Sequence, residues 1–164
     1  MEKTVSSSIG TSNANMLSLI EKLQSACIDT LLSTGGLAIG VASKAKVKVV
    51  TATKAFVDGK IITITVQEVV LSGTVANAKF NVYAITCDNT GKLQAVMGTE
   101  GATLATVVFP TVPVDNCVLG FVSINPTGAG SFVGGTTDLD DAGVIPNAAY
   151  YNTPYPFNPN AVTQ

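Results

Sequence analysis

The spacing of apolar residues changes once along this chain, at Gly35-Gly36, and the change predicts two kinds of structure. Before the two glycines, apolar residues recur at steps of three or four: Met16, Ile20, Leu23, Cys27 and Leu31. This is the period of an amphipathic helix, and Gly35-Gly36 is a natural end for one. We therefore predict one helix near residues 15–33, after a flexible arm over residues 1–14. Its apolar stripe would pack on the protein's own sheet or, alternatively, form a short seam between subunits.

After the glycines the pattern has period two, which is typical of β-strands. Residues 44–49 alternate strictly between lysine and apolar side chains, and Asp58-Gly59 separates two β-rich runs as the turn of a hairpin does. Further strands are predicted at residues 78–87, 93–97 and 117–124, with a turn at residues 89–92. Several short strands joined by turns predict a mostly β fold, an antiparallel β sandwich or barrel.

A third pattern begins at Pro146, where prolines and aromatic residues replace the alternation. Proline prevents helix and discourages central strands, so this end is predicted to be an extended arm. Its aromatic residues are the candidate contacts with a partner: Tyr150, Tyr151, Tyr155 and Phe157. The arm would dock on its own domain or on a neighbouring subunit. The chain is thus divided into an N-terminal arm and helix (1–36), a β domain (37–145) and a C-terminal arm (146–164).

The composition argues against an enzyme. The 164 residues include no His, no Arg and no Trp, and only 12% are charged, against 46% hydrophobic. The ordinary pKa of His suits proton transfer near neutral pH, and Arg is the usual clamp for phosphates and carboxylates. Their absence excludes serine–histidine and cysteine–histidine nucleophiles and histidine-containing zinc sites. We expect no catalytic residue, no cofactor and no metal.

The net charge bears on whether the protein binds nucleic acid, and the cysteines bear on the redox state of its cell compartment. A net charge of −2 and a pI near 4.9 argue against nucleic acid, whose phosphates attract Lys and Arg. Cys27, Cys87 and Cys117 are interpreted as buried thiols in a reducing cytosol; one disulfide or an intermolecular bridge is the alternative. No secretory signal is expected. No membrane span is expected either, because Pro126 and five glycines interrupt the long uncharged run at residues 116–137.

Three lysines of the alternating run, Lys44, Lys46 and Lys48, would share one strand face. The favoured interpretation is solvated lysines, which also protect an edge strand against stray pairing. The alternative is a strip that binds an anion.

Three carboxylates, Asp138, Asp140 and Asp141, could supply oxygen ligands for Ca²⁺. Their spacing does not match an EF-hand loop. We favour a single helical turn, capped by Thr136 or Thr137 and ended by Gly143, in which the acids lie near the positive N-terminus.

The C-terminal half carries four pieces in a fixed order. They are Gly-Thr-Glu at residues 98–100, FPTVP at 109–113, a strand and turn ending in Asn-Pro-Thr-Gly at 119–128, and a Phe-x-x-Gly-Thr-Thr-x-Leu-Asp-x-Ala-Gly-Val stretch at 132–144. With a Lys-Val-Lys strand after Gly-Leu-Ala-Ile-Gly, this set resembles small phage virion proteins described as capsid decoration (cement) or head structural proteins. The resemblance covers roughly residues 36–152. Neither the N-terminal helix nor the tail after Tyr151 belongs to it.

The resemblance implies a non-enzymatic virion protein that binds the major capsid protein and so decorates and stabilises a phage capsid. It implies a homo-oligomer, with a trimer as the best guess, assembled in the host cytoplasm and found on the capsid exterior. It carries over no catalytic residue. A receptor-binding or head-fibre adhesin-like module is the alternative, although carbohydrate sites favour exposed aromatic residues and Trp is absent. An enzyme ranks third.

Overall fold

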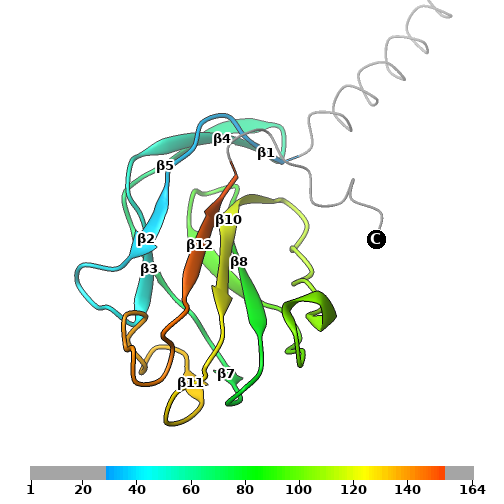
Figure 1. The fold of residues 1–164 in the computed structure, drawn as a ribbon. Helices are drawn as coiled ribbons and strands as arrows, with labels where there is room; N and C mark the ends of the chain where they lie inside the picture. Colours follow the sequence, from blue (N-terminus) through cyan, green and yellow to red (C-terminus); the bar gives the residue numbers. More distant parts are fainter. Residues whose placement is uncertain (1–28, 154–164) are drawn as a thin grey trace, which may run out of the picture.

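In the computed structural model, residues 29–153 are described, and they form a body made of short β-strands (Figure 1). In chain order the strands are β1 (Thr30–Leu31), β2 (Leu37–Ile39), β3 (Lys46–Val49), β4 (Thr53–Val57), β5 (Lys60–Ile64), β6 (Glu68–Val70), β7 (Thr74–Val75), β8 (Asn81–Asp88), β9 (Leu93–Met97), β10 (Asn116–Ile124), β11 (Phe132–Val133) and β12 (Ala149–Asn152). The helical element of this range is a single 3₁₀ turn, η1 (Leu104–Thr106).

The strands pair into four antiparallel sheets, and none of the four closes on itself. Their orders are β12-β10-β8-β9, β2-β3-β6, β1-β4-β5 and β11-β7. In Figure 1, β12, β10 and β8 stand side by side, the hairpin of β4 and β5 crosses one end of the body, and β7 and β11 lie at the other. The prediction of a mostly β, antiparallel fold is confirmed.

One hydrophobic core lies between these sheets. It takes Ile85 from β8, Ile124 from β10, Val47 from β3 and Val57 from β4, none of which is exposed. Burying each such side chain contributes about 1.5–3 kcal/mol. The Tyr83 ring is also buried, and its hydroxyl donates a 3.0 Å hydrogen bond to the carbonyl oxygen of Ser72. Burial raises the pKa of Tyr83, so this hydroxyl stays a neutral donor.

Two hairpins follow the predicted turn chemistry. Asp58 and Gly59 have φ angles of 49° and 71°, the left-handed pair that a two-residue type I′ turn requires between β4 and β5. Between β8 and β9, the Gly91 N–H donates to the Asp88 carbonyl, and Gly91 has a φ of 81°. This is a type I turn followed by a left-handed residue, the usual three-residue hairpin. Both predicted turns are confirmed.

Side-chain amides bridge the two seams where the largest sheet meets the β2-β3-β6 sheet. At one seam β12 lies beside β2, and the Leu37 N–H donates a 2.6 Å hydrogen bond to Oδ1 of Asn152. At the other, β6 lies beside β9, and the Gln67 side chain donates to the Gly91 carbonyl and accepts from the Leu93 N–H. A few side-chain hydrogen bonds thus replace a backbone ladder.

The N-terminal prediction needs a correction at its end. Most of the predicted helix, residues 15–28, lies outside the described residues. Its last part is wrong, because Thr30–Leu31 form strand β1, opposite Phe56 and Ala55 of β4. Leu31 is buried in the core of the sheets. A partner strand and an apolar core therefore determine the structure of these residues, and the period of the preceding stripe does not extend to them.

The body also extends past residue 145, into the predicted C-terminal arm. Residues 149–152 form β12, an edge strand paired with β10. Prolines flank this strand at Pro146 and Pro154, and none lies within it, so no ladder donor is missing. This part of the arm docks on its own domain.

Candidate interaction surface

Three aromatic side chains lie in a row on the outer face of the four-stranded sheet. Tyr151 on β12 is the direct cross-strand partner of Phe121 on β10, so both side chains point to the same face. The Phe121 ring meets the Phe109 ring edge to face, with 5.7 Å between ring centroids. Tyr151 is 52% exposed and Phe109 50%. We call Tyr151, Phe121 and Phe109 the aromatic row.

A β-bulge places Phe121 on the outer face. The register between β10 and β8 shifts between Val118 and Gly120, so one extra residue enters β10. Leu119 and Val122 consequently both point into the core, although they are three positions apart. Strict alternation from Cys117 would have placed Phe121 inside. This is why the sequence pattern did not identify it as a surface residue.

The segment from residue 98 to 115 carries Phe109 and lies over the same sheet. A backbone bridge joins Gly101 to Phe80, just before β8, and a second bridge, between Thr99 and Val108, closes the segment on itself. Asn81 also donates a 3.1 Å hydrogen bond to the Gly98 carbonyl. The segment therefore presents Phe109 from a fixed backbone.

The surroundings of the row carry little charge. Residues 104–114, 117–124 and 145–153 contain no Lys, Asp or Glu. The 98–115 segment also exposes Val108 to 56% and Val114 to 84%. An exposed apolar area with aromatic members and no charge is the usual composition at the centre of a protein–protein interface.

The four residues predicted to contact a partner separate into three groups. Tyr151 belongs to the aromatic row. Tyr150 faces the opposite side of β12 and packs, partly buried, against the core. Tyr155 and Phe157 lie outside the described residues. Phe109 and Phe121, by contrast, had not been predicted from the sequence.

A cavity of about 370 Å³ opens beside Tyr150, between β2 and the loop before β12. Its walls are mostly apolar, Ile39 and Ile145 among them, with Asp140 at one side. The Tyr150 hydroxyl is buried and finds no hydrogen-bond partner among residues 29–153. Desolvation, with a contribution from Asp140, raises the pKa of Tyr150 to about 12, so the hydroxyl stays protonated at neutral pH. The cavity can hold an apolar group and donate one hydrogen bond through the Tyr150 hydroxyl, and the carboxylate at its side, Asp140, is paired with Lys44.

The acidic stretch folds into hydrogen-bonded turns instead of the predicted helical turn. The Asp141 carbonyl accepts hydrogen bonds from the N–H groups of Val144 and Ile145, and its side chain accepts one from Gly143. Asp140 forms an exposed 2.6 Å ion pair with Lys44, which raises the pKa of that lysine. The Asp141 side chain bonds to the backbone of its own turn, and Asp140 pairs with Lys44, so these side chains stabilise turns and not a helix.

The lysine row is confirmed only in part. Lys46 and Lys48 share a face of β3, while Val47 and Val49 are buried. Lys44 precedes the strand. In addition, β3 lies between β2 and β6, so its lysines do not protect a sheet edge as expected.

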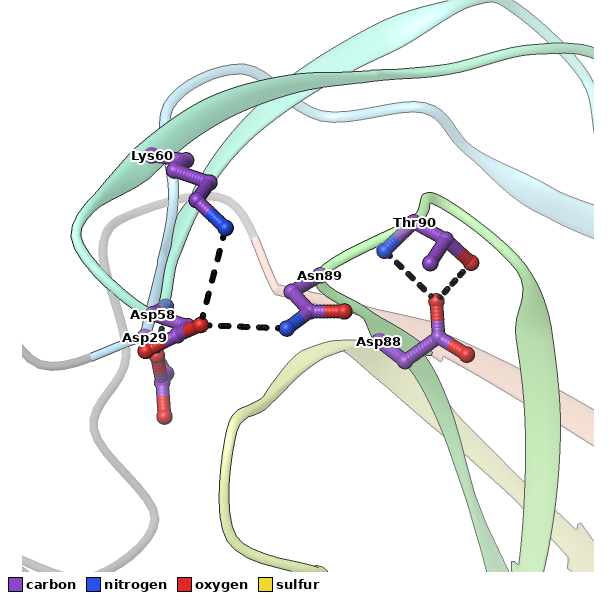
Figure 2. A network of polar contacts seen from close by, with 6 residues as sticks. All are labelled: Asp29, Asp58, Lys60, Asp88, Asn89 and Thr90. Atoms are coloured by element: carbon purple, nitrogen blue, oxygen red, sulfur yellow. Dashed lines mark hydrogen bonds and ion pairs between the residues drawn. The ribbon is translucent and has the colours of Figure 1, made fainter.

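A polar network joins two turns at one end of the body (Figure 2). The Asp58 N–H donates to Oδ1 of Asp29 at 3.0 Å, and Oδ2 of Asp58 accepts a 3.1 Å hydrogen bond from Asn89. Lys60 lies 3.9 Å from the same oxygen. These contacts connect the β4–β5 turn with the β8–β9 turn, so we assign the network to the fold.

The neighbouring Asp88 closes its own turn (Figure 2). Its Oδ1 accepts hydrogen bonds from the Thr90 hydroxyl at 2.6 Å, the Thr90 N–H at 2.9 Å and the Lys92 N–H at 3.1 Å. These bonds, the one from the Thr90 hydroxyl above all, lower the pKa of Asp88. The carboxylate is a turn cap and is not available as an acid or base.

Within residues 29–153, no group of three or more His, Cys, Asp or Glu residues is arranged to hold a metal ion. The same part of the chain contains no helix of the length and apolar character needed to cross a membrane. Comparison with protein-family models, curated proteins and solved structures gave no match.

Proposed function

We propose that this protein is a non-enzymatic structural component of a virus particle, which decorates a phage capsid and stabilises it by binding the major capsid protein. The observation that carries the proposal is the aromatic row, an exposed and uncharged patch fixed on a rigid sheet. A rigid patch loses little conformational entropy on docking, so more of its burial contributes to affinity. The ordered set of sequence pieces that resembles decoration proteins supports the same assignment.

The proposal includes the finer description of the fold, an antiparallel sandwich or barrel. The single core between the sheets and the two bridged seams support it. It also includes a homo-oligomer, with a trimer as the first expectation, because a weakly charged surface suits symmetric packing. Light scattering after size exclusion tests this part. A monomer both in solution and on the capsid would contradict it.

Co-sedimentation with capsids tests the function. Tyr151→Ser combined with Phe109→Ser should weaken binding to capsids of the source virus at least tenfold, since aromatic anchors dominate such interfaces. Ile61→Ser is the matched control, because Ile61 is 67% exposed on β5, in a different sheet. Circular dichroism must show all variants folded. Wild-type protein that fails to bind capsids, or a double variant that binds like the control, would contradict the proposal.

The receptor-binding or adhesin-like module remains the second candidate, because exposed aromatic rings can also stack on sugar rings. The same variants distinguish the two. Binding to host cells or their surface glycans that depends on Tyr151 and Phe109, without binding to capsids, would favour this second function.

A further inference from the structure

Two of the three cysteines lie directly opposite each other in the largest sheet. Cys87 on β8 and Cys117 on β10 are register partners, so their side chains point to the same face. Both belong to the hydrophobic core and neither has exposed surface. Sγ of Cys117 donates a 3.8 Å hydrogen bond to the Val118 carbonyl, and the neighbouring Cys87 thiol together with burial raises the pKa of Cys117.

The backbone geometry of such a pair suits a covalent bond. Directly opposite residues of an antiparallel pair have Cα atoms about 4.5–5.5 Å apart, and disulfides span about 4.4–6.8 Å. We propose that Cys87 and Cys117 are the site of a disulfide that forms on oxidation and joins β8 to β10. The strands are already paired on both sides of the two cysteines, Asn116 with Asp88 and Val118 with Thr86, so the bond needs no change of register.

The reaction needs a two-electron oxidant, for which oxidised glutathione serves. One cysteine thiolate attacks the glutathione disulfide and releases one glutathione, and the second thiolate then attacks the mixed disulfide and releases another. The two protons and two electrons lost by Cys87 and Cys117 end on the two reduced glutathione molecules. Both thiols are buried, and burial disfavours the thiolate of Cys117, so oxidation of the folded protein waits for local opening of the sheet and is slow.

The bond would separate two stages in the life of the protein. In a reducing cytosol the pair stays open, and in an oxidising medium outside the cell it closes. This timing rests on the proposed function, since a virion protein passes from one medium to the other. The bond itself does not, because it is measured on the isolated protein without capsids.

Trypsin makes the test direct, because cleavage after lysine places each cysteine in a different peptide: residues 23–44, 80–92 and 93–164. The protein is unfolded, reduced, refolded in a buffer of reduced and oxidised glutathione, and digested without reduction. We expect peptides 80–92 and 93–164 to be joined, and the intact mass to fall by about 2 Da for the two lost hydrogens.

Three variants serve as controls. Cys27→Ala should keep the bridge, whereas Cys87→Ala and Cys117→Ala should lose it. The melting temperature of wild type and Cys27→Ala should rise by roughly 5–10 °C on oxidation, and a reductant should reverse the rise. Natively refolded protein with three free thiols, or a bridge to Cys27, would overturn the proposal. If the protein does not refold, native protein is oxidised with diamide for hours and digested with trypsin without reduction, and the same pair of joined peptides is sought. Capsid binding plays no part in this readout.

Discussion

Individual residues in this protein are held by hydrogen bonds to their immediate neighbours, and several occupy backbone conformations that their type rarely adopts. Ala78 has a φ of 60°, where its N–H donates a 2.7 Å hydrogen bond to the Pro126 carbonyl. Gly59 has a φ of 71° in the β4–β5 turn, and a Cβ there would meet nothing within 4 Å. Substitutions at these two positions therefore measure how a left-handed backbone conformation affects the free energy of unfolding, with little change in side-chain contacts.

Exchanging the residue types at these positions should change stability in opposite directions. Gly59→Ala should lower the free energy of unfolding by about 1 kcal/mol, and Ala78→Gly should raise it by about 0.5 kcal/mol, because only the conformational preference changes. Urea denaturation followed by circular dichroism measures both. Two shifts of the same sign would show that contacts, rather than backbone conformation, decide the effect.

Glu68 gives a pH-dependent prediction. Its Oε1 accepts hydrogen bonds from the N–H groups of Val41 and Ala42, at 2.6 Å and 2.9 Å. These bonds, first that of Ala42, lower the pKa of Glu68 below its ordinary value of 4.5. A lowered pKa in the folded state contributes stability that is fully present above the unfolded-state pKa and is lost as the pH falls through the folded-state pKa.

Glu68→Gln should therefore melt below wild type at pH 7, and the difference should shrink as the pH falls below 4.5. Thermal melts at a series of pH values measure this. Lys54→Gln on β4, in a different sheet, is the control for removing one charge. A difference that stays constant down to pH 3 would contradict the role of the charge.

At the scale of elements, the sequence predicted those strands whose signals are local. The β4–β5 and β8–β9 turns require residues with a positive φ, and the sequence has suitable ones at Asp58-Gly59 and Gly91. Both hairpins could therefore be predicted. The strands at 81–88 and 116–124 are long enough for their composition to identify them. Strands β1 and β12 could not be found this way, because each has four residues or fewer and exists only through its partner strand. The aromatic row depends on a bulge and on pairing between distant segments, and neither leaves a local pattern.

The pairing of β12 with β10 depends on Gly120. A Cβ at Gly120 would collide with the backbone carbonyl of Tyr151 and lie 2.7 Å from Cδ1 of Leu37. Gly120→Ala should thus push β12 away and cost about 1–3 kcal/mol, as overpacking does. Amide hydrogen exchange should show β12 deprotected before the rest of the body.

Gly130→Ala is the matched control, because nothing lies within 4 Å of its added Cβ. It should melt within about 1 °C of wild type, as surface substitutions usually do. If Gly120→Ala melts like this control, β12 does not depend on the close approach.

At the scale of the whole molecule, the described body ends at Thr153, and a chain truncated there tests the role of the residues that follow. The Thr153 hydroxyl donates a 2.8 Å hydrogen bond to the Leu119 carbonyl and anchors the end of β12. A chain shortened after Ile145 would lose β12 and with it part of the core packing at Tyr150. A chain that ends at Thr153 keeps the body and removes only residues 154–164, with Tyr155 and Phe157.

We expect the chain ending at Thr153 to melt within about 2 °C of full-length protein, since no described contact is removed. If residues 154–164 contact another subunit or the capsid, this chain should lose oligomerisation or capsid binding. Light scattering and co-sedimentation measure the two. Unchanged assembly together with a sharply lower melting temperature would show that the segment belongs to its own domain.

The two bridged seams have a mechanical consequence. A load applied along a paired strand is shared by many backbone hydrogen bonds at once, whereas the seams at Asn152 and Gln67 are held by a few side-chain amides and by packing of the shared core. Under tension across the body, the sheets should part at the seams while each ladder stays intact. We therefore expect the body to yield first at the seams, with the backbone hydrogen bonds of each sheet still formed.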